Sequence, residues 1–463
     1  MALDGHRSGA SVSDHQIAAR IERLPFSRWH FKIGTVIGTG WFFDAFDALA
    51  IAYVLPVLIG LWKLAPGQIG LLISIGYAGQ IVGSIFFGWL AERIGRVPCT
   101  LFTLAIFTVM SFLCIFAWNV ESLMAIRFVQ GLGLGGEIPV MATYISEFAN
   151  ARRRGRLGLG YQMLFTIGLT VVALVATWVV PHLGWQWMFV IGAAPALLVL
   201  PLRRLLPESP RWLARQGRAD EADRVLSAIE DEISQHGARP LPPIPAGVPP
   251  VQAARTRFTD LFKGIYLRRT ISVWVIWFCA YLIVYGLSTW MPSIYRTVYK
   301  LPVSQSLNYS LAAAAFGTCC AILAVFIIDI IGRKALFAIG QFLGAIPLLY
   351  LGLHTDLDAF HVLLLVAFGF GCNSMLAISL STYTAELYPT ELRALGCGVG
   401  NSWLRFASVI GPFFIGWILP HYGLGAVFLV FGIAAVIGGL TAVFFATETN
   451  GKVLETLSPS LSS

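Results

Sequence analysis

The chain has 463 residues, of which 57% are hydrophobic and 12% are charged. Soluble domains carry about 25% charged residues, so this composition excludes a soluble globular protein and places most of the chain in a lipid bilayer. The net charge of +8 would suit a nucleic-acid partner, unless membrane topology explains where the positive residues lie.

The predicted elements are twelve apolar segments, each close to the roughly 20 residues that cross a bilayer as a helix. Six lie near residues 33–59, 70–91, 98–118, 121–146, 157–180 and 187–206. Six more lie near residues 270–295, 306–330, 335–352, 360–385, 395–419 and 425–446. We therefore expect an all-α membrane protein of twelve transmembrane helices in two pseudo-symmetric six-helix bundles. Its parts are an N-terminal segment 1–32, a bundle 33–206, a linker 207–269, a second bundle 270–446 and a tail 447–463.

The polar segments predict little regular structure of their own. Residues 219–235 mix acidic and basic side chains as a surface helix does, whereas residues 239–250 contain six prolines and predict an extended linker. The first 25 residues are polar, and no small-residue cleavage site follows the first apolar segment, so we expect no removable signal peptide. The seven cysteines are odd in number and lie within or at the ends of predicted spans, which argues against a disulfide framework.

Lys and Arg are unevenly divided between alternate loops. One side of the membrane carries 27 of them, the other side only Lys63, Arg296 and Lys300, and Arg127 and Arg405 lie inside predicted spans. Because positive residues gather in cytoplasmic loops, we expect both termini in the cytoplasm and the chain in the plasma (inner) membrane. Topology thus explains the basic balance, and we expect no nucleic-acid partner.

Two charged loops are repeated along the chain. Gly95 and Gly332 are 237 residues apart, as are Arg96 and Arg333, whereas Glu147 and Glu386 are 239 residues apart. Duplicated units in matching order are the usual architecture of secondary transporters. We expect the charged members of these loops to form gates on the cytoplasmic side. They are Glu92, Arg96, Glu147 and Arg154 in the first copy, and Asp329, Arg333, Glu386 and Arg393 in the second.

The sequence contains no pattern of an enzyme. The glycine-rich run at 131–136 follows a helical apolar stretch and has no Gly-Lys-Ser or Gly-Lys-Thr ending, so it does not indicate a phosphate loop. We also find no constellation typical of a nucleophile or a metal site, and we expect neither a cofactor nor a metal.

Five charged residues inside the predicted spans need explanation: Asp44, Asp47, Arg127, Glu137 and Arg405. A charge near the bilayer centre costs about 2.5–3.5 kcal/mol on insertion scales, so each requires a partner or a function. Asp44 and Asp47 are three residues apart and share a helix face, roughly 16–21 Å into the first span. Mutual repulsion and burial favour the neutral form of such carboxyl groups, which makes them candidate proton carriers.

The partners of these charges are not fixed by the sequence. Arg127 can form a structural ion pair with Asp47 or act with it as a protonatable switch. Glu137 can carry a proton or satisfy backbone groups freed by the neighbouring Pro139. Arg405, about 15 Å into the eleventh span, can hold a substrate anion or a protein carboxylate.

The loop at 88–96 (GWLAERIGR) resembles the signature of the major facilitator superfamily, with Glu92 where Asp is usual and Val97 where a basic residue is common. The segments 207–212 (PESPRW) and 448–454 (ETNGKVL), with the Glu and Arg pairs of the repeated loops, resemble sugar porters. The resemblance covers about residues 33–455 and implies two six-helix bundles that rock about a central site.

Local detail separates the chain from sugar porters and brings it nearer to carriers of aromatic acids. The Gln-Gln and Ser-Gly pattern of sugar porters is missing from 277–292 (WFCAYLIVYGLSTWMP). Residues 44–56 (DAFDALAIAYVLP) are similar to aromatic acid:proton symporters. Residues 135–140 (GGEIPV) and 388–393 (YPTELR) are similar to nicotinate transporters related to synaptic vesicle glycoprotein 2.

We therefore predict that the chain imports a small aromatic carboxylate together with protons, and nicotinate is the first candidate substrate. Asp44, Asp47 and Glu137 are the predicted proton carriers and Arg127 modulates Asp47. The predicted substrate contacts are an anchor, Arg405, an aromatic sandwich of Tyr281, Tyr285 and Trp403, and hydrogen bonds from Gln162, Asn373 and Asn401. We expect the chain to act as a monomer whose partners are the anion, protons and the lipid bilayer. The alternatives are a sugar or polyol symporter, or a receptor of the same fold that does not transport.

Overall fold

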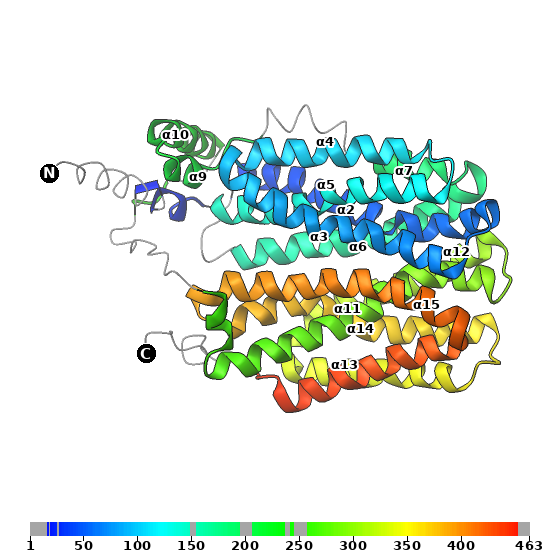
Figure 1. Ribbon diagram of the computed structural model, residues 1–463. Coiled ribbons are helices and arrows are strands. Elements are labelled where there is room, and N and C mark those ends of the chain that lie inside the picture. Colours follow the sequence, from blue (N-terminus) through cyan, green and yellow to red (C-terminus); the bar gives the residue numbers. More distant parts are fainter. Residues whose placement is uncertain are drawn as a thin grey trace.

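The structure, a computed structural model, describes residues 16–17, 19–25, 27–148, 154–194, 206–236, 241–244 and 257–451, with the side chains of 154–162, 236, 390, 391 and 394 outside the description. All regular secondary structure in these residues is helical, which confirms the expected all-α class. The helices of the two halves lie side by side as two bundles, the first half above the second in Figure 1.

The N-terminal bundle contains six helices. They are α2 (Arg28–Trp62), α3 (Pro66–Ile94), α4 (Arg96–Cys114), α5 (Val120–Phe148), α6 (Arg154–His182) and α7 (Gln186–Gly192). These match the first six predicted spans, although α2 begins five residues before residue 33, and the sixth predicted span is described only as far as residue 194.

The C-terminal bundle contains five helices, of which α15 is kinked. They are α11 (Ile265–Thr297), α12 (Val303–Ile331), α13 (Arg333–Leu353), α14 (Ala359–Leu387) and α15 (Thr390–Phe445). Gly423 interrupts α15 with φ 77° and ψ 178°, a conformation that a residue without a side chain adopts easily. The kink separates the predicted spans 395–419 and 425–446, so α15 supplies the last two spans.

Nine helices of the described residues are long and apolar enough to cross a membrane. That number treats α15 as one helix, and it leaves out α7 and α5, of which α5 contains Arg127 and Glu137. The chain is therefore a multi-pass membrane protein, and its helices account for the twelve predicted spans within the part that is described.

Glycine allows α3 and α5 to approach very closely. A methyl group added to Gly79 would lie 2.2 Å from the carbonyl oxygen of Phe128, and one added to Gly135 would lie 2.1 Å from that of Gln80. Helices in a membrane associate largely through such small-residue contacts, since the lipid provides no hydrophobic drive. The backbone of α3 at Gln80 is thus fixed against α5.

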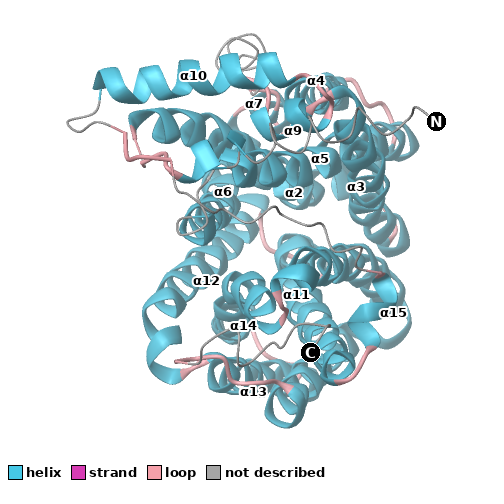
Figure 2. Ribbon diagram, turned by 90° about the vertical axis from the view of Figure 1, so that its left-hand side faces the viewer, coloured by secondary structure: helices cyan, strands magenta, loops and turns pink. Residues whose placement is uncertain are grey.

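The linker between the bundles folds onto the first bundle. Its helices are α9 (Pro210–Arg215) and α10 (Ala219–His236), followed by a short 3-10 helix, η1 (Phe258–Phe262). The predicted helix at 219–235 is confirmed by α10. Arg20 and Arg23 hold α10 through Glu230, at 2.8 and 2.6 Å. We call the end of the molecule with α9, α10 and both ends of the described chain the terminal end (left in Figure 1, facing the viewer in Figure 2) and the opposite end the far end.

Candidate functional site

A buried ion pair joins the first and fourth helices of the N-terminal bundle. The guanidinium Nη1 of Arg127 lies 3.1 Å from Asp47 Oδ2 and also donates to Gln130 Oε1 at 2.8 Å. Gln130 in turn donates to Ser111 Oγ at 2.6 Å. Asp47 and Arg127 are 0% and 3% exposed, so the predicted pairing of these two residues is present and is sealed from water.

Asp44 and Glu137 are buried without such partners. Both carboxylate oxygens of Asp44 and Oε2 of Glu137 make no hydrogen bond within the described part of the chain. A methyl group added to Gly40, one helical turn before Asp44, would lie 2.6 Å from Glu137 Oε1. Glu137 therefore reaches across from α5 to α2, on the same helix as Asp44. A buried ionised carboxylate without a partner is costly, which makes Asp44 and Glu137 candidates for proton binding.

Arg405 lies on α15 and reaches across to the other bundle. Its Nη1 donates a hydrogen bond to Gln80 Oε1 of α3. No carboxylate lies within ion-pair distance of Arg405 among the described side chains. Asp44, Tyr281 and Tyr285 are close enough to Arg405 to interact electrostatically, which places the guanidinium near the middle of the molecule.

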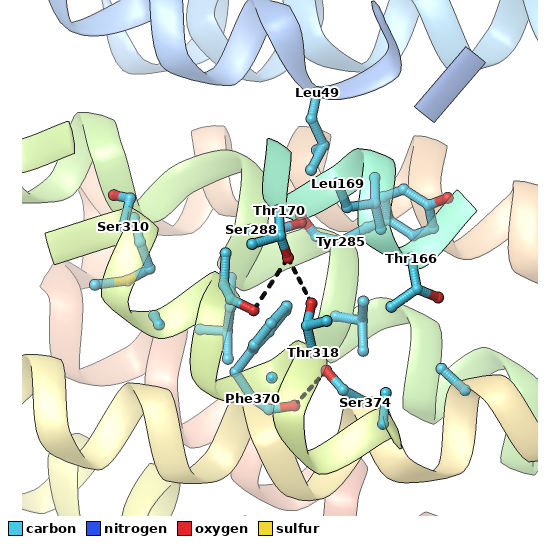
Figure 3. Close-up of a pocket in the computed structure, with 18 of the residues that line it drawn as sticks. Leu49, Thr166, Leu169, Thr170, Tyr285, Ser288, Ser310, Thr318, Phe370 and Ser374 are labelled. Carbon is cyan, nitrogen blue, oxygen red and sulfur yellow. Dashed lines mark hydrogen bonds between the residues drawn. The ribbon is translucent and has the colours of Figure 1, made fainter. Parts of the chain in front are cut away.

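A cavity between the bundles is lined by five helices, α2, α6, α11, α12 and α14. Its volume is about 70 Å³, several times the roughly 10–15 Å³ that a single water requires. Figure 3 shows hydroxyl groups around it, with Thr170 of α6 hydrogen-bonded to Thr318 of α12. The remaining polar lining is also hydroxyl-bearing and includes Tyr53, Thr166, Ser288, Ser310 and Ser374.

Tyr281 and Tyr285 line this cavity from successive turns of α11. Their rings stack at 6.0 Å, Trp277 stacks on Tyr281 at 5.3 Å, and Tyr77 of α3 meets Tyr285 edge-on at 5.3 Å. Tyr281 donates its hydroxyl hydrogen to the carbonyl of Ala377 at 3.1 Å. An aromatic ring entering the cavity would therefore meet an aromatic wall.

Trp403 does not complete a sandwich with these tyrosines in this conformation. It lines a separate groove between α3 and α15, beside Arg405, Ile81 and Phe406. There it packs at 5.3 Å against Trp274 and at 5.5 Å against Phe406. The expected three-ring sandwich is thus absent, because Tyr281 and Tyr285 line the cavity whereas Trp403 lines the groove and packs against Trp274 of α11.

Two of the three predicted amide contacts lie apart from the cavity. Asn401 is exposed on α15, one turn before Arg405. Asn373 is fully buried, donates to the carbonyl of Gly369 at 2.9 Å, and faces Gly344 of α13 inside the C-terminal bundle. The side chain of Gln162 lies outside the described residues.

The repeated charged loops form matching ion pairs at the terminal end. Arg96 pairs with Glu147 at 3.0 Å and with Glu92 at 2.8 Å. Arg333 pairs with Glu386 at 3.2 Å and with Asp329 at 2.6 Å. Each set joins helices within its own bundle, and none of these pairs crosses between bundles. Arg393 makes no ion pair with the side chains described, and the side chain of Arg154 lies outside them.

Sequence reasoning did not include Glu208 and Glu448 among the functional residues. Glu208 accepts hydrogen bonds from the backbone N–H groups of Arg96 and Val97 at 3.0 and 3.2 Å. Glu448 accepts from those of Arg333 and Lys334, both at 3.0 Å. Free backbone donors at a helix start favour such acceptors. The signal that could have found them is their separation of 240 residues, close to that of the repeated loops.

Hydrogen bonds between the two bundles occur only in the middle and far part of the described structure. Ser74 of α3 donates to the carbonyl of Val409 at 2.7 Å, and a methyl group added to Gly70 would lie 2.7 Å from the carbonyl oxygen of Pro412. Towards the terminal end, Thr143, Ser381 and Asn401 are exposed. The contacts between α3 and α15 therefore lie in the middle and at the far end of the described structure, whereas these three polar side chains nearer the terminal end are exposed.

Comparisons with known proteins agree with this architecture. Residues 34–461 match the family described as "Sugar (and other) transporter". The "Niacin transporter NiaP" of Acinetobacter baylyi is 33% identical, covering 95% of this chain and 99% of that one. The "Synaptic vesicle 2-related protein" of Xenopus laevis is 27% identical, covering 94% and 81%. A crystal structure of a D-xylose-proton symporter has a TM-score of 0.72 at 20% identity, covering 91% of this chain and 99% of that one.

Proposed function

Because the chain belongs to the sugar (and other) transporter family of the major facilitator superfamily, we propose that it imports nicotinate, or a closely similar aromatic carboxylate, together with protons. The terminal end is the cytoplasmic face in this proposal, as the excess of Lys and Arg in its loops requires. In this proposal the bundles rock about the central region. A relative named as a niacin transporter supports this choice of substrate.

The observation that carries the proposal is the environment of Arg405. A guanidinium is permanently charged and presents a planar fork that matches a carboxylate. Here its described side-chain partner is the neutral amide of Gln80, so its charge is left uncompensated by any ion pair. A substrate carboxylate would supply that compensation, and the tyrosine wall of Tyr281 and Tyr285 would receive the attached ring.

The proton side of the proposal rests on Asp44 and Glu137, with the Asp47 and Arg127 pair beside them. One proton moving with a monovalent anion transfers no net charge, so only the pH gradient would drive uptake. A second proton would add about 2.3 kcal/mol per 100 mV of membrane potential. Substrate-induced current in proteoliposomes distinguishes these stoichiometries.

The anchor is tested by replacing Arg405. We expect Arg405→Ala to raise the Kd for nicotinate by roughly 10- to 100-fold, since a hydrogen bond to a charged group contributes about 1.5–3 kcal/mol. Arg405→Lys should retain part of the affinity, because the charge remains and the fork is lost. Arg296→Ala is the matched control, as Arg296 is exposed and donates only to the carbonyl of Leu301. An unchanged Kd in Arg405→Ala would refute the anchor.

A sugar or polyol is the second candidate, and the hydroxyl lining of the cavity favours it. Thr170, Ser288 and Thr318 present donors and acceptors that suit a neutral polyhydroxylated ligand. If this candidate is right, xylose or glucose raises the melting temperature of the purified protein and nicotinate does not.

A further inference from the structure

In the contact between Gln80 and Arg405, the amide of Gln80 occupies the place on the guanidinium that a ligand would take. Gln80 is 3% exposed and sits in the middle of α3. Its amide oxygen accepts from the guanidinium of Arg405 across the boundary between the bundles. This is the one hydrogen bond that the guanidinium makes within the described residues, and its acceptor is neutral.

A carboxylate is a better partner for that guanidinium edge than an amide oxygen. Arginine and a carboxylate frequently pair through two parallel N–H···O bonds, whereas Gln80 offers the guanidinium a single neutral acceptor. A groove lined by Ser402, Trp403 and Phe406 of α15 and by Ile81 and Ile85 of α3 runs alongside Arg405. The guanidinium of Arg405 therefore borders a groove and is not enclosed on every side by packed side chains.

Gln80 cannot follow Arg405 when the bundles move. Its backbone is held against α5, where a methyl group added to Gly135 would lie 2.1 Å from the carbonyl oxygen of Gln80. Arg405 belongs to the C-terminal bundle, and the next hydrogen bond between α3 and α15, from Ser74 to Val409, lies nearer the far end. The Gln80 bond is thus the α3 to α15 hydrogen bond nearest the terminal end in the described structure.

We propose that Gln80 is a positioning residue that holds the anchor Arg405 in the substrate-free protein and gives way to the substrate carboxylate. The proposal rests on the proposed role of Arg405. Arrival of the anion breaks the hydrogen bond from Arg405 to Gln80, the α3 to α15 hydrogen bond nearest the terminal end. Occupancy of the site therefore loosens this interface between the bundles. Gln80 thereby lowers the affinity for the substrate while it keeps the empty guanidinium oriented.

Two substitutions of similar size make opposite predictions. Gln80→Met removes the acceptor, and we expect the Kd for nicotinate to fall about three- to tenfold, the range of one net hydrogen bond. Gln80→Glu places a carboxylate on the guanidinium, and we expect the Kd to rise at least about tenfold, as for a charged partner. Gln68→Met, the same exchange on an exposed far-end position of α3, should leave the Kd unchanged. Binding is measured by titration calorimetry, after thermal unfolding shows that each variant is folded.

The outcomes separate this inference from the proposed function. If Arg405→Ala weakens binding while Gln80→Met also weakens it, or leaves it unchanged, the anchor stands and the competing role of Gln80 is overturned. If Gln80→Glu binds as tightly as the unaltered protein, the competition is likewise overturned. If Arg405→Ala has no effect on the Kd, the proposed function fails before Gln80 is considered.

Discussion

The two bundles resemble each other at their terminal ends and differ at their centres. Glu208 and Glu448 cap the starts of α4 and α13 in the same way. The hydroxyl of Tyr144 donates to the carbonyl of Pro207 at 2.7 Å, and that of Tyr383 donates to the carbonyl of Thr447 at 3.1 Å. The repeated loops, caps and tyrosines thus belong to a duplicated scaffold.

The centres do not follow the repeat. At the spacing of 239 residues that relates α5 to α14, Arg127 corresponds to Val366 and Glu137 to Leu376, both buried and apolar. The same comparison relates Arg405 of α15 to Thr166 of α6. Charged groups that only one half carries are not part of the repeated scaffold, which makes them the residues to test for chemistry.

The largest effect is expected from breaking the buried pair of the N-terminal bundle. Arg127→Leu would leave Asp47 buried and without a cation, since the two atoms now 3.1 Å apart lose their attraction. Removing one partner of a buried ion pair typically costs about 3–5 kcal/mol. We expect a loss of that order in the free energy of unfolding, measured by denaturant titration in detergent.

The double variant Asp47→Asn with Arg127→Leu provides the control. It removes the buried charge that the single variant leaves behind, so it should be more stable than Arg127→Leu alone. Equal stability of the single and double variants would show that Asp47 takes up a proton once Arg127 is removed, as a proton switch requires.

Variants of Asp44 and Glu137 should lose proton coupling without losing the fold. Asp44→Asn and Glu137→Gln keep the size of carboxyl groups whose buried oxygens have no described partner, so both variants should fold. With one coupled proton, a pH gradient of one unit supports about a tenfold substrate gradient, or about 1.4 kcal/mol. We expect each variant to lose this accumulation in proteoliposomes while counterflow exchange persists. Retained accumulation in both variants would remove these residues from the proton path.

The C-terminal bundle has its own departure from the repeat. Gln341 and Asn373 correspond to Leu104 and Leu134, yet both are 0% exposed, and both amide atoms of Gln341 and the oxygen of Asn373 have no described partner. An unsatisfied buried polar group costs about 1–3 kcal/mol. We expect Gln341→Leu to raise the free energy of unfolding by about 1–2 kcal/mol.

The reciprocal substitution is the matched control, and Asn373 adds a functional readout. Leu104→Gln should destabilise the N-terminal bundle by a similar amount. If Gln341→Leu is destabilising instead, a buried water or ligand satisfies the amide. Asn373→Leu should leave the Kd for nicotinate unchanged because the side chain faces α13, and a weaker affinity would return Asn373 to the substrate site.

Much of the fold could be predicted because insertion into lipid imposes simple rules. Span length, the distribution of Lys and Arg and the repeated loops predicted twelve spans, and the separate helix α10 was placed within one residue. The pairing of Arg127 with Asp47 followed from the cost of isolated charges. The position of Trp403 in the groove and the orientation of Asn373 toward α13 could not be predicted in this way. The face of a helix that meets a given neighbour depends on packing across both bundles. Gln80 was missed because a single neutral amide gives no signal until its partner is located.

The smallest effect is expected at the helix caps Glu208 and Glu448. These two residues occupy matching positions in the repeat, but their pKa values differ. Burial raises the pKa of Glu208 despite hydrogen bonds from the backbone of Ser209, Arg96 and Val97. Burial alone would also raise the pKa of Glu448, but four backbone hydrogen bonds lower it below its ordinary value. The stabilisation by Glu448 is present above its unfolded pKa and is lost as pH falls through its lower folded pKa, whereas acidification relieves the strain at Glu208.

Acidification should therefore loosen the start of α13 before the start of α4. As the pH falls below about 4, the ordinary pKa of glutamate, we expect amide exchange, corrected for its intrinsic rate, to accelerate at Lys334 and not at Val97. At neutral pH, Glu448→Gln should cost about 0.5–1 kcal/mol, within the range of helix caps, and Glu208→Gln less than that. Equal acceleration at both caps would mean that the two halves are energetically as well as geometrically repeated, and that the asymmetry of this protein is confined to its centre.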